Sequence, residues 1–467
     1  MKMWSGRFRQ PLDPEFERWQ RSFDFDHRLL AHELAASSAH ARALKSAGIL
    51  SSDELIGILQ GLEKIKAQAA ASSAFLEDPE AEDVHHFVEK QLALLIGETG
   101  YKLHSGRSRN EQIATDLRLY VRTTIEQLRN DLADLCGVLT ERAAQAGDAA
   151  MPAYTHLQRA EPVLVAHWLM AYVEMFLRDA DRFSDCASRL NLCPLGSGAV
   201  AGATLALDRN LMAETLGFDA PTANSIDATS DRDFALEFVN TLSLLALHLS
   251  RWAEEMILFS TQEYGFIGLP EAYSTGSSAM PQKKNGDLLE LVRGKSGRVI
   301  GHATALLVTL KGLPLAYNKD LQETQEQVFA ASDTMLAMLP LVACWMRSVE
   351  FHFHVMQQAA QSGFMNAWAA ATYLVNRGVA SRHSHEVIGK AVRLCLDKNC
   401  ELRDLSLDEL RTLSPAFDQS FYECLSLASV LAIHDVPGGT APARVRQAIA
   451  AAKKRIESIR EEAHAHA

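Results

Sequence analysis

The stretch IATDLRLYVRTTIEQLRNDLADLCGVL, residues 113–139, decides the fold class. Its apolar side chains recur in steps of three and four, the spacing that puts them on one face of an α-helix. These residues are Ile113, Leu117, Val121, Ile125, Leu128, Leu132, Leu135 and Leu139. The run has no proline and only Gly137 before Gly147, so it predicts a helix on the order of 50 Å long. A helix of that length has to bury its apolar stripe against other long helices.

Two further runs show the same helical spacing. One follows Pro162 and continues through Trp168, Tyr172 and Phe176. The other consists of Leu242, Leu245, Leu249, Trp252, Met256 and Phe259. No convincing alternating strand pattern accompanies them, so we expect an all-α protein with three or more long helices. Helices of this kind can also pack between subunits.

Length and composition exclude several classes of protein. The chain has 467 residues, which predicts two or three domains. Its net charge is −12 with no basic tract, so nucleic-acid binding is not expected. No segment approaches the roughly 20 apolar residues of a membrane helix, and MKMWSGRFRQPLD at the N-terminus is not a secretory signal. Seven scattered cysteines without a CxxC pair indicate a reducing compartment, and we expect the cytoplasm.

Three polar stretches interrupt the helical pattern at the edges of long helical runs. They are residues 104–110 (HSGRSRN), 154–161 (YTHLQRAE) and 274–285 (STGSSAMPQKKN). In the last, Gly276 would permit a positive φ, backbone amides would bind an oxyanion, and Lys283 would neutralise a carboxylate. A serine in that field could act as a base. A solvated turn explains the composition equally well.

The other two stretches are less specific. Arg109 suits carboxylate binding at a helix N-terminus, although a simple helix cap is the favoured explanation of residues 104–110. His156 stands just before a helix and is one of 17 histidines. His85, His86, His352 and His354 are interpreted as structural, because no acidic or cysteine residues stand near them at metal-ligand spacing.

GSSAMPQKKN at residues 276–285 resembles the signature loop of the fumarase/aspartase superfamily, which reads GSS, one variable residue, then MP-x-K-x-N. Within the superfamily the chain resembles the argininosuccinate lyases over nearly its whole length. The stretches that carry this resemblance are WSGRF (4–8), HSGRSRNEQIATDLRLY (104–120), YTHLQRAEPV (154–163), PLGSGAVAG (194–202), NSIDATSDRDFALEF (224–238), YNKDLQE (317–323) and GGTAPARVR (438–446).

The resemblance implies three helical domains, at residues 1–105, 106–355 and 356–467. Long central helices of four subunits would form a bundle in a homotetramer, with each active site built from three subunits. The implied reaction is the reversible β-elimination of argininosuccinate to arginine and fumarate, the last step of arginine biosynthesis. It takes a small-molecule substrate and no cofactor or metal.

The resemblance also implies roles for individual residues. Ser277 would be the base that removes the proton beside a carboxylate, and Lys283 with loop amides would stabilise the resulting aci-carboxylate. His156 would help to protonate the leaving nitrogen, and Glu290 would orient His156. Substrate contacts are implied for Ser22, Arg109, Asn110, Thr155, Arg232, Asn285, Tyr317 and Gln322.

The chain departs from the family pattern at three positions near these motifs. Gly286 stands where the family has proline, Glu161 where it has glutamine, and Gln325 where it has a lysine that binds a substrate carboxylate. Two alternatives follow. One is a sister lyase acting on adenylosuccinate, aspartate or malate, against which the QKKN ending and the WSGRF opening argue. The other is a structural helical tetramer related to the lens crystallins, which the retained elimination residues disfavour.

Overall fold

The structure, a computed structural model, describes residues 10–465, so the WSGRF motif at residues 4–8 lies outside the described residues. The chain divides into two compact units. The first contains Met1–Gln127, Arg182–Leu244 and Arg298–Met335, and the second contains Leu128–Asp181, Leu245–Gly297 and Leu336–Ala467.

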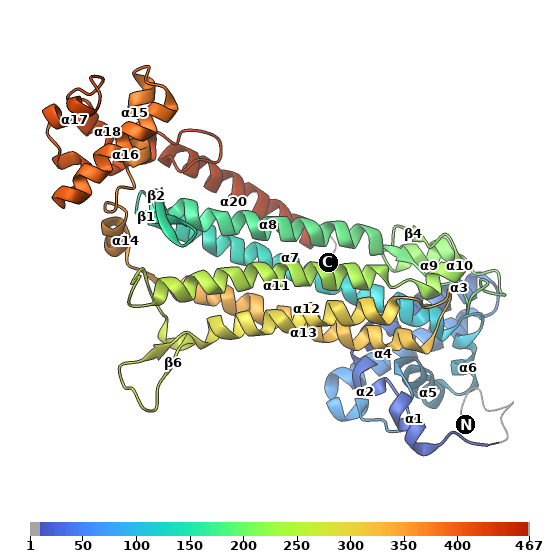
Figure 1. The fold of residues 1–467 in the computed structure, drawn as a ribbon. Helices are drawn as coiled ribbons and strands as arrows, with labels where there is room; N and C mark the ends of the chain where they lie inside the picture. Colours follow the sequence, from blue (N-terminus) through green and yellow to red (C-terminus); the bar gives the residue numbers. More distant parts are fainter. Residues whose placement is uncertain (1–9, 466–467) are drawn as a thin grey trace. The chain divides into compact units, whose positions relative to one another are not determined.

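Five long helices, each contributing to both units, dominate the ribbon in Figure 1. They are α7 (Arg109–Ala146), α8 (Val165–Leu190), α11 (Asp233–Ser260), α12 (Asp287–Leu310) and α13 (Glu323–Ser348). Helix α7 has 38 residues and is about 57 Å long at 1.5 Å per residue. It ends before Gly147, whose φ of 55° is incompatible with a right-handed α-helix. The long helix predicted from residues 113–139 is therefore confirmed.

In the second unit the apolar stripes of the long helices face one another. Trp252 of α11 packs edge-on against Trp345 of α13 with ring centroids 5.2 Å apart, and both are fully buried. Helix α12 joins them through Ser296, which donates a hydrogen bond to the carbonyl of Ala246 at 2.8 Å. Apolar burial of this kind is the main stabilising term for long helices.

The second unit also contains the shorter C-terminal helices. They are α14 (Phe353–Ala359), α15 (Ala367–Asn376), α16 (Ser381–Lys398), η7 (Leu402–Asp404), α17 (Leu407–Leu413), α18 (Phe421–Cys424), α19 (Leu427–Ala432) and α20 (Pro442–Ala465). Helices α15 to α18 surround a core in which the rings of Phe417 and Phe421 lie 4.8 Å apart.

The first unit gathers the N-terminal helices around the start of α7. They are α1 (Pro14–Gln20), α2 (Phe23–Asp26), η2 (His27–Leu29), α3 (Leu30–Ser46), α4 (Ser52–Ala71), η3 (Ser73–Leu76), α5 (Val84–Ile96), α6 (Glu98–Tyr101) and η4 (Lys102–His104). The ring of Phe23 stacks on the ring of Phe87 with centroids 4.8 Å apart, and this contact packs α2 against α5. The unit also contains α9 (Arg209–Thr215), α10 (Ser225–Ser230) and η6 (Lys319–Gln322).

Strands occur among the described residues as four two-stranded pairs. They are β1 (Ala150–Thr155) with β2 (Gln158–Leu164), β3 (Leu192–Cys193) with β4 (Ala220–Pro221), β5 (Ile267–Gly268) with β8 (Glu350–Phe351), and β6 (Thr275–Gly276) with β7 (Lys284–Asn285). The expectation that no strand interrupts the helices was therefore wrong for residues 150–164. Pro152 and Pro162 face each other in that hairpin, and proline usually argues against a strand.

One helical segment, Lys319–Ser348, is long and apolar enough to cross a membrane by length and composition alone. Its most apolar window is 61% buried inside the protein, as in the core helix of a globular domain. The sequence prediction, that no segment approaches roughly 20 apolar residues, did not single out this segment.

Candidate functional site

A cavity of about 130 Å³ lies in the first unit, at the start of helix α7. Five of the eight residues predicted to contact substrate line it together: Ser22, Arg109, Asn110, Tyr317 and Gln322. They come from three segments that are far apart in the sequence.

Arg109 begins helix α7 in the wall of this cavity. Its guanidinium forms ion pairs with Glu82 at 3.2 Å and Asp83 at 3.0 Å, which set its direction. The neighbouring Asn110 donates its side-chain amide to the carbonyl of Ala199 at 3.2 Å. The positive end of the helix dipole adds attraction for an anion at this place. Arg109 therefore lies at the N-terminus of a long helix, as predicted, and it is the first residue of that helix.

Ser22 is held by a buried carboxyl group that sequence reasoning missed. Its hydroxyl donates to Asp26 at 2.6 Å, and the backbone N–H of Val84 donates to the other oxygen of Asp26 at 3.0 Å. Burial, helped by the nearby charge of Asp83, raises the pKa of Asp26 to about 7. The spacing of Ser22 and Asp26 by four residues is the only local signal of this contact.

The segment around η6 forms a further part of the wall of this cavity. Ala316 has a φ of 66°, a left-handed conformation that a residue with a side chain adopts at a cost of about 1–3 kcal/mol. The strained residue turns the chain immediately before Tyr317, whose pKa is raised by burial. Gln322 donates its side-chain amide to the carbonyl of Gln20 at 3.1 Å. Gln325, where the family pattern has lysine, is 4% exposed and lines the same cavity.

His85 also lines the cavity and is backed by a fully buried acidic pair. Its Nδ1 lies 2.9 Å from Glu33 and 3.6 Å from Asp116. Neither oxygen of Asp116 has a hydrogen-bond partner among the described residues, and burial together with Glu33 raises the pKa of Asp116 well above its usual value. His85 and Arg107 lower the pKa of Glu33 despite its burial, so Glu33 is the ionised member of the pair and Asp116 the protonated one.

His85 was interpreted as structural because no acidic residues stand near it at metal-ligand spacing, but the fold gives it two acidic partners. Glu33 and Asp116 are both distant from it in sequence, on helices α3 and α7, and only the fold brings them within 4.8 Å. Ligand spacing along the chain cannot find such a group. A group of this composition can bind a metal ion, but Glu33 already accepts hydrogen bonds from Ser37 at 2.6 Å and Gln112 at 3.1 Å.

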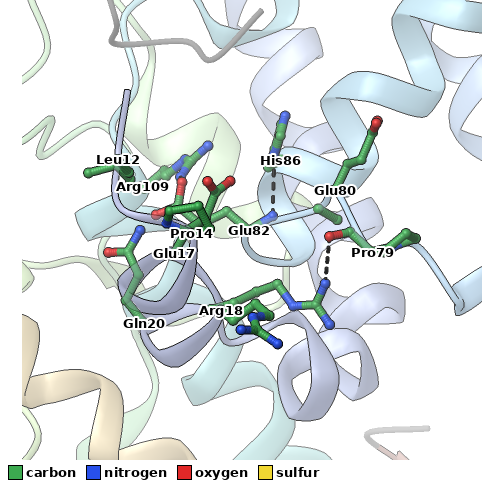
Figure 2. Close-up of a pocket in the computed structure, with 12 residues that line it drawn as sticks. Leu12, Pro14, Glu17, Arg18, Gln20, Pro79, Glu80, Glu82, His86 and Arg109 are labelled. Atoms are coloured by element: carbon green, nitrogen blue, oxygen red, sulfur yellow. Dashed lines mark hydrogen bonds and ion pairs between the residues drawn. The ribbon is translucent and has the colours of Figure 1, made fainter. Parts of the chain in front are cut away.

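A larger cavity of about 290 Å³ lies beside helix α1 (Figure 2). Arg109 and Glu82 line both this cavity and the smaller one. The dashed contacts are the N–H of Glu82 donating to Nδ1 of His86 at 3.2 Å and Arg21 donating to the carbonyl of Pro79 at 2.7 Å. The Arg109–Glu82 pair therefore has open space on more than one side.

Arg232 lies outside the smaller cavity. It is 2% exposed, donates to the carbonyl of Asp231 at 2.7 Å, and lines a separate cavity of about 180 Å³ with Asp227 and Asp233. Burial lowers the pKa of Arg232 to about 10.

The signature loop belongs to the second unit and spans residues 277–283, between strands β6 and β7. The Ser277 hydroxyl oxygen accepts hydrogen bonds from the backbone N–H groups of Ala279 at 3.3 Å and Met280 at 3.1 Å. Ser277 is partly exposed and Lys283 is exposed. Asn285 donates to the hydroxyl of Thr275 at 3.5 Å.

The expectation of a positive φ at Gly276 was wrong. Gly276 forms strand β6 and pairs with Lys284, so its backbone is extended. No atom lies within 4 Å of a Cβ placed on Gly276, so there is open space beside the backbone at this residue. Gly286, where the family pattern has proline, has only ordinary contacts for such a Cβ, with Leu269 and Leu289 at 3.5 Å.

His156 occupies the tip of the β1–β2 hairpin in the same unit. Thr155 pairs with Gln158, so the turn has two central residues, His156 with φ 53° and Leu157 with φ 57°. Two positive φ values define a type I′ turn, which normally uses asparagine and glycine. Holding His156 there stores strain of the kind that clusters at functional sites.

The predicted elimination residues are all at least partly accessible within one chain. Thr155, His156 and Glu290 are exposed, and Glu290 lies in the first turn of α12. Among residues 10–465, no hydrogen bond or ion pair joins His156 to Glu290. Glu161, where the family pattern has glutamine, lies 3.5 Å from Nε2 of His434.

Comparisons with known proteins identify the family of the chain. A lyase family model matches residues 6–301, and a model described as the argininosuccinate lyase C-terminal region matches residues 364–432. The chain is 61% identical over 467 residues to an argininosuccinate lyase of Koribacter versatilis, covering 100% of both chains. It is 59% identical over 464 residues to an argininosuccinate lyase of Acidobacterium capsulatum, covering 98% of this chain and 96% of the relative.

Solved structures show the same fold. EDDS lyase in complex with formate matches with a TM-score of 0.83 at 26% identity, covering 98% of this chain and 93% of that one. A class II fumarase from Schistosoma mansoni matches with a TM-score of 0.72 at 16% identity, covering 85% and 90%. The second likeness concerns the fold alone.

Proposed function

The chain belongs to the argininosuccinate lyase family, and we propose that it cleaves argininosuccinate reversibly to arginine and fumarate. The protein is a carbon–nitrogen lyase that acts on a small molecule. The full-length likeness to two proteins named argininosuccinate lyase carries the proposal. The reaction would supply arginine as the last step of its biosynthesis.

The reaction sets three chemical requirements. A base removes a proton from the carbon beside a carboxylate of the succinate part, and that carboxylate takes up the electron pair as an aci-carboxylate. The electron pair then forms the carbon–carbon double bond of fumarate while the carbon–nitrogen bond breaks. An acid supplies a proton to the leaving guanidino nitrogen. The site therefore needs a base, an anion-stabilising group and an acid.

Ser277 is the proposed base and Lys283 the proposed anion-stabilising group. Two backbone N–H groups donate to the Ser277 oxygen, and donors of this kind favour the deprotonated form of an oxygen. Lys283 has no ion pair among the described residues, so its ammonium is available for a substrate carboxylate. Asn285, at the end of the same hairpin, is a proposed substrate contact.

His156 is the proposed acid, and the strained turn supports this assignment. A turn with two positive φ values projects the imidazole at a defined angle from a short, rigid hairpin. Glu290 would orient the imidazole in the assembled enzyme, and Thr155 would contact the substrate. The cavity residues Ser22, Arg109, Asn110, Tyr317 and Gln322 would bind the remainder of the substrate, with Arg232 as a further contact.

We propose that the enzyme is a homotetramer with active sites shared between subunits. Exposed apolar side chains on the long helices favour association, because apolar surface of this kind is stabilised by burial. These residues are Leu244 and Leu247 on α11, Leu291, Ile300, Leu307 and Val308 on α12, and Leu341 on α13. The exposure of His156, Lys283 and Glu290 also fits groups that meet a partner subunit.

Two further proposals concern the domains of the chain and its cellular compartment. The segments 1–105, 106–355 and 356–467 remain the proposed helical domains. The cytoplasm is the proposed compartment, which the seven free cysteines support because a reducing environment keeps thiols free.

A substrate panel tests the function. Purified protein is supplied with argininosuccinate, adenylosuccinate, aspartate or malate, and fumarate is measured by its ultraviolet absorbance. We expect fumarate from argininosuccinate alone. Release from another compound would favour a sister lyase, and release from none would favour the structural alternative.

A further inference from the structure

The turn of the β1–β2 hairpin depends on contacts outside itself. Its central residues, His156 and Leu157, both have positive φ, a backbone pair for which asparagine and glycine are preferred. A strained conformation of this kind persists only where the surrounding structure holds it. Leu157 is 69% exposed, so the packing of its own side chain contributes little. The contacts that hold the turn therefore have to lie in the strands on either side.

On strand β1 the nearest contact is aromatic. Tyr154 stands two residues before His156. Its ring centroid lies 6.0 Å from that of Phe259, near the end of α11, and 5.6 Å from that of Tyr264. Aromatic contacts of this kind fix the position of the strand that leads into the turn, but they do not constrain the strand that leaves it.

On strand β2 the contact is polar and comes from Arg159, which pairs with Tyr154 across the hairpin. The guanidinium donates to the carbonyl of Ala359 at 3.3 Å and to the hydroxyl of Ser362 at 2.9 Å. Ala359 is the last residue of α14, which lies beside the hairpin (Figure 1). A carbonyl at that position has no partner within its own helix, and the negative end of the helix favours a cation.

We infer that Arg159 is a positioning residue for His156: its contacts with the end of α14 hold the strained turn and so fix the direction of the imidazole. Without these contacts the turn would relax toward negative φ and rotate the imidazole. A displacement of about 1 Å at a reacting group can lower a rate on the order of 10²-fold. The inference rests on the proposed function, because His156 is the proposed acid.

The experiment combines loss of the contact with relief of the strain. Arg159→Met removes the guanidinium and keeps an unbranched side chain. Leu157→Gly supplies the residue that a type I′ turn prefers at this position, so the turn no longer needs an outside contact. Arg377→Met is the matched control, because Arg377 is an exposed arginine of the same unit that donates to the hydroxyl of Ser420, also at 2.9 Å.

Arg159→Met should lower kcat for fumarate release from argininosuccinate about 10- to 100-fold. KM should change by less than about threefold, because the imidazole acts on the leaving nitrogen in the transition state. When Leu157→Gly is added to Arg159→Met, kcat should return to within about threefold of that of Leu157→Gly alone. Arg377→Met should change neither kcat nor KM.

A second measurement does not depend on turnover. Hydrogen exchange of the backbone amides of residues 150–164, read by mass spectrometry, reports how firmly the hairpin is held. Exchange should be faster in Arg159→Met than in the wild type, and it should return toward the wild-type rate when Leu157→Gly is added. Thermal unfolding of each variant checks that it has folded.

Normal kcat or unchanged exchange in a folded Arg159→Met variant would overturn the inference, as would a loss no larger than in Arg377→Met. A double variant as slow as Arg159→Met alone would also overturn it, because Arg159 would then act on something other than the turn. If Arg159→Met does not fold, Ser362→Ala decides, since it removes the shorter contact from the exposed side of α14. It should lower kcat about threefold and Leu157→Gly should reverse this, whereas an unchanged kcat would overturn the inference.

Failure of the proposed function is recognised separately, as wild-type protein that releases no fumarate from argininosuccinate. Hydrogen exchange in Arg159→Met, with and without Leu157→Gly, would still decide whether Arg159 holds the turn.

Discussion

Replacing Ser277 by alanine should separate catalysis from folding. The hydroxyl makes two hydrogen bonds, of 3.1 and 3.3 Å, to backbone N–H groups of its own loop. The loop is largely exposed, so water can replace these contacts. A typical intramolecular hydrogen bond contributes about 0.5–1.5 kcal/mol, and exposure reduces this, so the loss of stability should stay below about 1 kcal/mol.

The loss of activity should be much larger. A positioned base contributes roughly 10²- to 10⁴-fold, which corresponds to about 2.7–5.4 kcal/mol in the barrier. Ser278 provides the matched control, because it is exposed and its hydroxyl makes no hydrogen bond among the described residues. Ser278→Ala should therefore retain most of the activity.

The assay has three parts: fumarate release, thermal unfolding, and calorimetric binding of argininosuccinate to each variant. We expect Ser277→Ala to bind substrate and unfold nearly as the wild type does while releasing almost no fumarate. Near-normal turnover in Ser277→Ala, or a larger loss in Ser278→Ala, would show that the base is a different residue. A fall in binding as large as the fall in turnover would show that the hydroxyl binds substrate instead.

Three further predictions follow from the structure. Light scattering at neutral pH should give about four times the 51.4 kDa chain mass, and an active, monodisperse monomer would contradict the shared site. Mixing Ser277→Ala with His156→Asn chains should restore part of the activity after subunit exchange, whereas confirmed exchange without recovery would place both groups in one subunit. Because the pKa of Asp26 is raised from 3.8 to about 7, the folded state retains a proton that the unfolded state loses, so this group's contribution to stability falls as pH rises across that interval. The melting temperature of Asp26→Asn relative to wild type should therefore increase from pH 4 to pH 8, and a constant difference would contradict the raised pKa.

The helical part of the fold follows from local periodicity. Residues 113–139 repeat in threes and fours over more than seven turns, and α7 extends across all of them. The β1–β2 hairpin could not be found in this way, because its turn is formed by His156 and Leu157 instead of asparagine and glycine. Two opposed prolines, Pro152 and Pro162, also remove the usual strand signal.

The site was predictable where its residues are adjacent in the sequence. Arg109 and Asn110 mark a helix start that local pattern identifies, whereas Ser22, Tyr317 and Gln322 were expected only through the resemblance. Asp26 and the Glu33–His85–Asp116 group were missed, because their relevance depends on contacts between distant segments. The prediction of a positive φ at Gly276 was wrong because Gly276 pairs with Lys284 in a two-stranded sheet, where the backbone is extended.

The local energetics also bear on the structural alternative. The hairpin keeps two non-glycine residues at positive φ, at about 1–3 kcal/mol each. Gln325 buries an acceptor without a donor among the described residues, a further cost of about 1–3 kcal/mol. Native proteins are stable by only about 5–15 kcal/mol, so these terms are a large fraction of the total. A purely structural tetramer would gain stability by replacing each of these residues, whereas a binding and elimination site uses them. The strained turn at His156 and the unpartnered acceptor of Gln325 in the cavity wall therefore favour the enzyme.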